Sequence, residues 1–275
     1  MDSRSRLWVG YPGELQALDT TGAVRVRTAL DAGGPLRIVG SGSARLYVRA
    51  GDELLSVDEE TGEVRMRRGE IGGAVVALDP RGRHLYLATE AGAVFGLHPR
   101  LLRPLWAWSR LGRRATAIDS SPEGDRLYLA LAGEGDSPPG EILVRDVQTG
   151  RVLASVQLSG AVRELVVGPT GILFLVLVED GGASLAALRP GPHGLTELWR
   201  HAPGNDAPPG TPQIRVSGTG GDLAAFVPGA AGLRVLDAHT GEVGLRTDDA
   251  PRDAAFGADG SLYLLFAEEI RVLRR

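Results

Sequence analysis

The sequence predicts an all-β fold of the β-propeller type, with seven blades of four strands each, and two observations support this. A leucine followed by an aromatic or apolar residue starts a strand-like run that recurs at intervals of 39, 39, 42, 46, 50 and 39 residues. Each interval holds about four short apolar runs separated by turn residues, and this period is typical of a propeller blade. The leucines of the seven copies are Leu7, Leu46, Leu85, Leu127, Leu173, Leu223 and Leu262.

The repeat also sets the expected domain organisation. Seven copies occupy nearly all of the 275 residues, so we expect a single propeller domain over residues 1–275. The alternatives are a six-bladed ring and a ring that is not fully closed.

One blade can be written out strand by strand between residues 74 and 110. Apolar runs at residues 74–79, 84–89, 93–97 and 105–110 are the expected first to fourth strands, with the first innermost. Proline and glycine stand between the runs, as hairpin turns require. The first strands of the blades, among them residues 74–79, 115–119, 162–167 and 252–256, should line the central channel. Tyr47, Tyr86, Tyr128, Phe174 and Tyr263 should occupy equivalent positions in successive blades.

Two kinds of turn recur between these strands. Turns between first and second strands read Asp-Pro-Arg-Gly at 79–82 and Ser-Pro-Glu-Gly at 121–124, where proline presets φ and glycine accepts positive φ. Turns between third and fourth strands follow Asp-x-x-Thr-Gly and begin at Asp58, Asp146 and Asp237, with a shortened copy at Asp19. We interpret these Asp and Thr residues as turn-building groups, because an Asp carboxylate can accept backbone N–H bonds within such a turn.

The two ends of the repeat are irregular. The first predicted strand, residues 6–10, is a second strand of its blade, and the last, residues 270–273, is a third strand. The sequence therefore predicts seven second and seven third strands but six first and six fourth strands. We expect the first blade to lack its inner strand and the seventh to lack its outer strand.

The turn motifs resemble those of a known family. Asp-x-x-Thr-Gly after an apolar strand, together with Ser-Pro-Glu-Gly before Arg126-Leu-Tyr-Leu, resembles the YVTN/YncE-like propellers of the quinoprotein-dehydrogenase-like superfamily. Trp106, Trp108 and Trp199 on predicted fourth strands look like the tryptophans with which PQQ-type repeats dock neighbouring blades. The resemblance implies a propeller fold of the WD40-like kind, and it leaves the function and the ligand open.

Composition excludes several kinds of chemistry. The net charge of −4 predicts no attraction to nucleic acid or anionic lipid, and no apolar run is long enough for a membrane span. Cysteine is absent, which excludes disulfides and thiolate catalysis. Lysine is also absent from the printed sequence, which fits codon bias in a GC-rich bacterial genome. Met1 opens no signal sequence, so we expect a cytoplasmic protein, or a periplasmic or extracytoplasmic one if an export segment was removed.

No catalytic or metal-binding motif is found. The five histidines have no metal-ligand spacing, and the nucleophile-elbow, dinucleotide-loop and zinc-protease motifs are all missing. Asn205 is the single asparagine, whereas the resemblance implies that quinoprotein dehydrogenases bind calcium with asparagine and acidic residues. We therefore expect no enzymatic activity, no catalytic residue, no metal and no cofactor.

The candidate binding residues lie in loops expected at one face of the propeller. Loops between second and third strands and the long link before the sixth blade should emerge together, and loops on rigid scaffolds often carry binding functions. We expect an acidic rim that attracts a basic peptide. Its residues are Glu14, Asp52, Glu53, Glu90, Glu134, Asp136, Glu179, Asp180, Asn205, Asp206, Glu268 and Glu269.

These expectations define two functional hypotheses. The first is a monomeric, non-enzymatic binding or scaffolding module that presents this rim to a protein or peptide partner. The alternative is a small-molecule-sensing domain or a lactonase-type hydrolase acting over the central channel.

Overall fold

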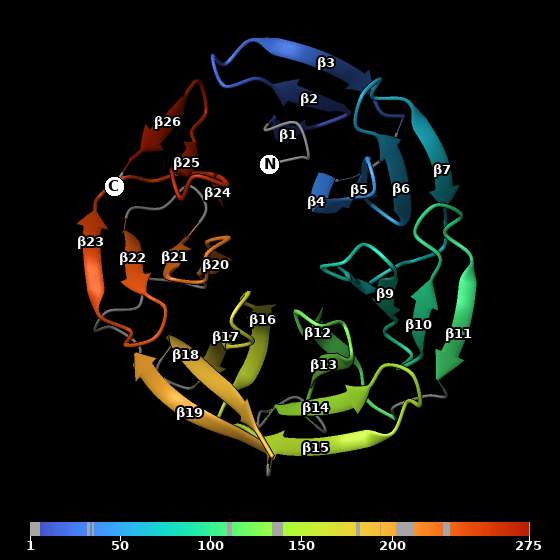
Figure 1. The fold of residues 1–275 in the computed structure, drawn as a ribbon, viewed down its shortest axis with the longest axis vertical. Helices are drawn as coiled ribbons and strands as arrows, with labels where there is room; N and C mark the ends of the chain where they lie inside the picture. The colour runs from blue at the N-terminus through green and yellow to red at the C-terminus, as the bar shows by residue number, and fades with distance from the viewer. Residues whose placement is uncertain are drawn as a thin grey trace. The chain divides into compact units, whose positions relative to one another are not determined.

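The computed structural model describes residues 6–31, 34, 36–108, 112–133, 140–179, 182–192, 194–201, 212–227 and 232–274. Every regular element in this part of the chain is a β-strand, and it contains no helix (Figure 1). The chain divides into two compact units, Met1–Gly124 and Asp125–Arg275. The prediction of one domain stays a prediction.

The first unit contains three complete antiparallel sheets, with strand orders β1-β2-β3, β4-β5-β6-β7 and β8-β9-β10-β11. It also contains β12, the first strand of a fourth sheet. The strands are β1 (Leu7–Tyr11), β2 (Glu14–Leu18), β3 (Val24–Ala29), β4 (Leu36–Gly42), β5 (Arg45–Ala50), β6 (Glu53–Asp58), β7 (Val64–Arg68), β8 (Val75–Leu78), β9 (Leu85–Ala88), β10 (Val94–Leu97), β11 (Pro104–Trp108) and β12 (Ala115–Ser120).

The second unit continues the fourth sheet, of order β12-β13-β14-β15, and adds the sheets β16-β17-β18-β19, β20-β21-β22-β23 and β24-β25-β26. Its strands are β13 (Arg126–Leu131), β14 (Glu141–Asp146), β15 (Val152–Gln157), β16 (Ala161–Val167), β17 (Leu173–Glu179), β18 (Gly182–Gly191), β19 (Gly194–His201), β20 (Gln213–Val216), β21 (Asp222–Phe226), β22 (Leu233–Asp237), β23 (Val243–Thr247), β24 (Asp253–Phe256), β25 (Leu262–Leu265) and β26 (Ile270–Leu273).

The seven sheets confirm the predicted fold class, an all-β propeller whose blades mostly have four strands. The irregular ends are confirmed as well, because the first and seventh sheets each have three strands in the described part of the chain. The first sheet starts at a second strand, and the seventh ends at a third strand. In the blade predicted from residues 74–110, the four observed strands are β8, β9, β10 and β11. They are shorter than the predicted runs by a few residues.

In six of the seven described sheets the second strand places a large side chain opposite a smaller residue of the third strand, and the exception is the sixth sheet, where Ala224 faces Val235. Tyr47 faces Ser56, Tyr86 faces Gly96, and Phe174 faces Ala187. These three rings are fully buried, and burial raises the pKa of Tyr47 to about 12, so its phenol is a neutral core group. Tyr128 and Tyr263 hold the same place, facing Val144 and Val272, which confirms the predicted equivalence.

The pairing of third and fourth strands is equally regular. In all six sheets that have both strands, the register shifts near the end of the third strand, between Ala17 and Leu18 in the first sheet and between Val235 and Leu236 in the sixth. Such a bulge strengthens the local twist of the pair. In the second, fourth and sixth sheets the bulge stands just before an Asp-x-x-Thr-Gly turn, where glycines such as Gly62 and Gly241 adopt positive φ.

These turns also join neighbouring sheets within each unit. The Thr28 hydroxyl on β3 donates to the Gly62 carbonyl at 2.8 Å, and Trp199 Nε1 on β19 donates to the Ala238 carbonyl at 3.1 Å. A Cβ on Gly62 or Gly241 would collide with the preceding sheet's fourth strand, at Val26 and Thr28 or at Trp199. The glycine therefore serves both the turn and the sheet-to-sheet contact.

Candidate functional site

In the first unit, the predicted rim residues lie where second strands turn into third strands. Glu14 begins β2, Asp52 and Glu53 lie between β5 and β6, and Glu90 lies between β9 and β10. Three of these carboxylates have arginine partners: Glu14 with Arg27 at 3.3 Å, Glu53 with Arg67 at 3.1 Å and Glu90 with Arg114 at 3.8 Å. Asp52 has no ion pair among the described residues.

In the second unit, Glu179 at the end of β17 is held by several donors. Arg200 donates to its Oε1 at 2.9 Å, Ser184 donates to its Oε2 at 2.8 Å, and Ser159 also donates to Oε1. Partial burial opposes ionisation of Glu179, but the Ser159 and Ser184 hydroxyls and Arg200 together hold its pKa below the ordinary value. Glu269 pairs with Arg271 at 2.6 Å, and Glu268 has no ion pair in the described ranges.

These contacts correct the electrostatic expectation. Five of the seven described rim carboxylates have an arginine partner, so they do not form a field of unpaired negative charge. Only Glu14 and Glu53 find theirs on the adjacent strand, and the turn residues considered alone do not show any of these partners. Glu134, Asp136, Asp180, Asn205 and Asp206 lie outside the described residues. Whether the twelve residues bind a partner stays a prediction.

A polar cluster that sequence reasoning missed lies on the first strands of three consecutive sheets in the second unit. Arg215 on β20 contacts Glu164 on β16 at 3.3 Å and Asp253 on β24 at 2.9 Å. Glu164 also accepts the Ile214 N–H at 2.9 Å. One guanidinium thus joins three sheets. The available signal was the presence of charged residues at the starts of otherwise apolar first strands.

The hydrogen bonds of Arg215 limit what this cluster can do. Besides the two carboxylates, Arg215 donates to Gln213 and to the carbonyls of Ile214 and Ala254, which makes five hydrogen bonds. A guanidinium has five N–H groups, so no donor is left for an anionic ligand. The cluster therefore acts as a clamp between strands rather than as an anion-binding site.

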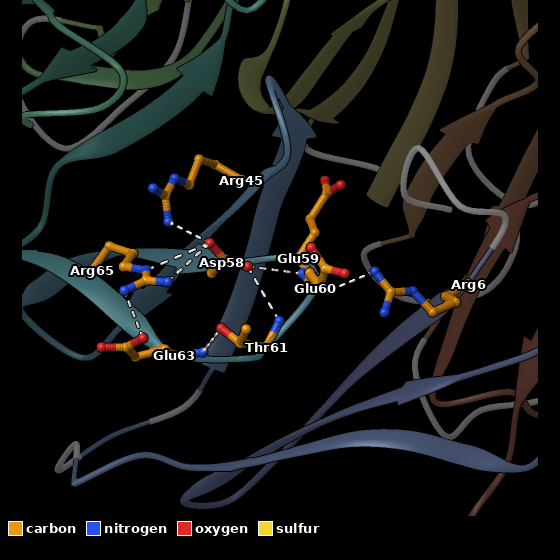
Figure 2. Close-up of polar contacts among 8 residues, drawn as sticks. All are labelled: Arg6, Arg45, Asp58, Glu59, Glu60, Thr61, Glu63 and Arg65. Carbon is orange, nitrogen blue, oxygen red and sulfur yellow. Dashed lines mark hydrogen bonds and ion pairs between the residues drawn. The ribbon is translucent and has the colours of Figure 1, made fainter.

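A second polar network surrounds the turn that follows β6 (Figure 2). Asp58 Oδ1 accepts the N–H groups of Glu60 and Thr61 at 3.0 and 3.2 Å. Its Oδ2 faces Arg45 at 3.2 Å and Arg65 at 3.4 Å. Although burial pushes the other way, these N–H groups and arginines hold the pKa of Asp58 below its usual value. The prediction that the repeated Asp residues build turns is confirmed here.

Figure 2 also shows how the first sheet reaches this turn. Arg6, which is buried, donates to the Glu59 carbonyl oxygen, and Arg65 extends past Asp58 to Glu63 at 2.6 Å. Equivalent turns repeat the local pattern, because Thr149 donates its N–H and hydroxyl to Asp146, and Thr240 donates both to Asp237. All these groups are engaged in holding the turn.

A buried carboxylate lies in the turn that follows β8. Asp79 is fully buried, accepts the Arg81 N–H at 3.0 Å and pairs with Arg83 at 2.9 Å. His84 Nδ1 lies 3.8 Å from the same carboxylate. Burial lowers the pKa of His84 despite the opposing effect of Asp79. His84 is therefore a neutral ring stacked on Tyr86, at 6.0 Å between centroids.

The tryptophans of the fourth strands make two different kinds of contact. Trp199 docks its sheet on the next, as the PQQ-type resemblance implies, and His201 Nε2 lies 2.8 Å from the Gly241 carbonyl oxygen beside it. Trp106 instead lies over Gly96 of its own sheet, where a Cβ would collide with the indole ring. Trp106 stacks on Trp108 at 4.5 Å between centroids.

Across the residues with described positions, no three His, Asp or Glu side chains come close enough together to hold a metal ion. A search of the same residues found no helix with the length and hydropathy to span a membrane.

Comparison of the sequence with known protein families identifies the family of this chain. Residues 5–168, more than half of the chain, match the family model described as outer membrane protein assembly factor BamB, and the chain belongs to that family. The wider quinoprotein-like propeller resemblance is thereby supported, while the YVTN/YncE subgroup is not what the match identifies. No curated protein matches the sequence significantly.

Solved structures agree with the fold. Hydrazine synthase from Kuenenia stuttgartiensis superimposes with a TM-score of 0.78 at 17% identity, over 98% of this chain and 92% of that one. The Cps50 (Swd1) β-propeller domain from Myceliophteria thermophila gives 0.75 at 14% identity, over 98% and 93%. BamB from Moraxella catarrhalis gives 0.59 at 18% identity, over 99% and 82%. At these identities the likeness concerns the fold alone.

Proposed function

We propose that this protein is a non-enzymatic module that binds a partner protein. The observation that carries the proposal is membership in a family named for an assembly factor of outer membrane proteins. Two further propellers of similar fold come from hydrazine synthase and from Swd1, and the same fold hosts many roles, so the family weighs more than the fold.

The contacts made by the clustered carboxylates of the described residues support a binding role. A reaction centre needs an acid, base or nucleophile that can reach a substrate. Here the clustered carboxylates of Asp58, Glu164 and Glu179 are each engaged by arginine and by N–H or hydroxyl donors. Their contacts fix turns and strand ends, and a fixed surface suits recognition because it loses little conformational freedom on binding.

The proposed contact surface is the set of turns between second and third strands, with the twelve rim residues as its candidate members. Its recognition would rest on turn shape and on the carboxylates at the turns, Asp52 above all, because most of the other described carboxylates are paired. Asp52, which is exposed and has no ion pair in the described part, is the best described candidate for a direct contact.

The test is quantitative capture of a partner from the source cells by a tagged chain after mild crosslinking. The variant Asp52→Asn/Glu90→Gln removes two rim charges, and the control Glu60→Gln/Glu63→Gln removes two charges from the turn after β6. We expect the rim variant to retain a few-fold less partner than wild type and the control to retain an equal amount. Equal retention by both variants, with both folded, would refute the proposed surface.

The alternative function, a small-molecule-sensing domain or a lactonase-type hydrolase, is tested by a separate assay. It requires saturable turnover or binding of a small lactone or quinone that is lost when Glu164 or Asp253 is replaced by its amide. The YVTN/YncE relationship suggested by the turns remains part of this proposal, and sequences of the full gene neighbourhood would test it.

A further inference from the structure

Arg234 on β22 is a charged residue on the face of the sixth sheet that packs against the fifth. Ala225 lies directly opposite Arg234 in the strand register, and Leu236 follows two residues later on the same strand. Ala225 and Leu236 belong to a buried cluster that also contains Phe174 and Leu185 of the fifth sheet. Residues directly opposite each other, or two apart on one strand, share a face of the sheet. The side chain of Arg234 therefore starts on this apolar face.

The equivalent position in the preceding sheets is the last residue but one before the register shift of the third strand. This residue is apolar in the second to fifth sheets, which have Leu55, Phe95, Leu143 and Ala186 there. Leu55, Leu143 and Ala186 are buried. An arginine at this position departs from the repeat, and burying its charge costs free energy unless acceptors pair with it.

The seventh sheet also has an arginine at this position, and there the arginine is paired. Arg271 contacts Glu269 at 2.6 Å and Asp249 at 3.0 Å. In the sixth sheet, Gly232 stands where the seventh sheet has Glu269, and it supplies no carboxylate. The Nε and Nη1 atoms of Arg234 are buried and have no hydrogen-bond acceptor among the residues that the structure describes. Arg234 thus lacks the acceptors that its counterpart has.

A second arginine lies directly opposite Arg234 on the outer strand. Arg246 on β23 faces Arg234 in the strand register, and Arg246 is exposed. Like charges directly opposite each other are unfavourable, so an anion between the two guanidinium groups stabilises both. The exposed side of Arg246 gives an anion its approach. No acceptor holds Nε and Nη1 of Arg234 in place, so its guanidinium can turn toward such an anion.

We propose that Arg234 and Arg246 bind a small anion, a carboxylate or a phosphate, at the outer part of the sixth sheet. Guanidinium groups form paired N–H···O hydrogen bonds with either of these groups. The anion supplies the acceptors that Arg234 lacks and offsets the two positive charges. This site goes beyond the proposed function, because it takes a small molecule and uses none of the turns between second and third strands.

The experiment measures binding of inorganic phosphate and of succinate to the whole chain by isothermal titration calorimetry, with chloride keeping the ionic strength constant. Arg234→Leu introduces the residue that the second and fourth sheets have at this position, and Arg246→Gln removes the second charge. Arg163→Leu is the matched control, because Arg163 is exposed and has no ion pair in the described part of the chain.

We expect wild type and the Arg163→Leu control to bind at least one of the two anions saturably. Binding should be about tenfold weaker for Arg246→Gln and absent for Arg234→Leu. The anion that binds more tightly identifies the ligand as a phosphate or a carboxylate.

Thermal unfolding without phosphate or succinate provides a second measurement. A buried charge without acceptors is destabilising, so Arg234→Leu should melt at a temperature at least about 3 °C above that of wild type. Adding the bound anion should raise the melting temperature of wild type and of Arg163→Leu, and it should leave that of Arg234→Leu unchanged.

Three results would overturn the proposal. The first is a wild-type chain that binds neither anion, or binds them no better than Arg234→Leu does. The second is a lower melting temperature of Arg234→Leu than of wild type in the absence of the anions, which shows that the guanidinium already has a partner. The third is an Asp206→Asn substitution that destabilises wild type but not Arg234→Leu, which shows that the chain's own carboxylate takes the place of the anion. The partner-capture assay uses other variants, so either proposal can fail while the other stands.

Discussion

At the residue scale, the charged side chains of this protein hold segments of the backbone together. Arg215 donates five hydrogen bonds, to two carboxylates, one side-chain amide and two backbone carbonyls. Asp58 accepts hydrogen bonds from two backbone N–H groups and pairs with two arginines. Groups bound in this way keep one geometry, because each partner restrains the other. The acidic and basic residues therefore matter first for stability.

Replacing Arg215 with methionine should lower the free energy of unfolding by about 3 kcal/mol, since it removes an arginine that pairs with the largely buried Glu164 carboxylate. Urea denaturation measures the change. Arg163→Met is the matched control on the neighbouring strand, where the side chain is exposed, and it should shift stability by less than about 0.5 kcal/mol. Equal losses for the two variants would show that the clamp has no special role.

The turn aspartates should make stability depend on acid pH. The Thr240 N–H, opposed by partial burial and helped by the His239 N–H, lowers the pKa of Asp237. A lowered pKa contributes stability above the unfolded-state pKa of about 3.9, and this stability is lost as pH falls through the folded-state pKa. Wild type should therefore exceed Asp237→Asn in stability at pH 6, and the difference should shrink at pH 3. A difference that grows on acidification would contradict the assignment.

At the element scale, the fourth strand of one sheet docks on the turn of the next. Thr28 and Trp199 make this contact with Gly62 and Ala238, while Trp106 packs within its own sheet. The two tryptophans look alike in sequence, and the difference lies in the third strand, where Gly96 leaves room for an indole ring. Contacts of this kind depend on neighbours far apart in the chain.

Trp199→Phe should cost about 1 kcal/mol more than Trp106→Phe, because only Trp199 loses a hydrogen bond to the adjacent sheet. Thermal and urea unfolding of both variants measure this difference. The expected local effect is faster hydrogen exchange in residues 237–241 for the Trp199 variant alone. Identical exchange in both variants would show that the indole contact does not hold the turn.

Local features were predictable and long-range ones were not. The strands, the Asp turns and the incomplete end sheets follow from periodicity and turn chemistry, which act over a few residues. The Arg215 clamp joins Glu164 and Asp253, which are 51 and 38 residues away, so no local pattern reveals it. The arginine partners of Glu14 and Glu53 were missed for the same reason, because they lie on neighbouring strands, while the binding role of the rim stays a prediction.

At the scale of the whole molecule, one repeat generates the seven described sheets, and we expect the turns to carry the binding function. The family match covers residues 5–168, and the remaining repeats follow the same strand order. Because the described charged clusters are engaged in holding strands and turns, the variable turns carry the expected difference between this protein and other propellers.

Hydrogen exchange of the free chain and of the chain bound to its captured partner tests the central claim most directly. The account predicts that protection on binding appears in the turns between second and third strands, at residues 12–14, 51–53 and 90–92. Protection confined to the turns at residues 58–62, 79–82 and 237–241 would contradict it, because those turns would then form the binding surface instead of only joining sheets.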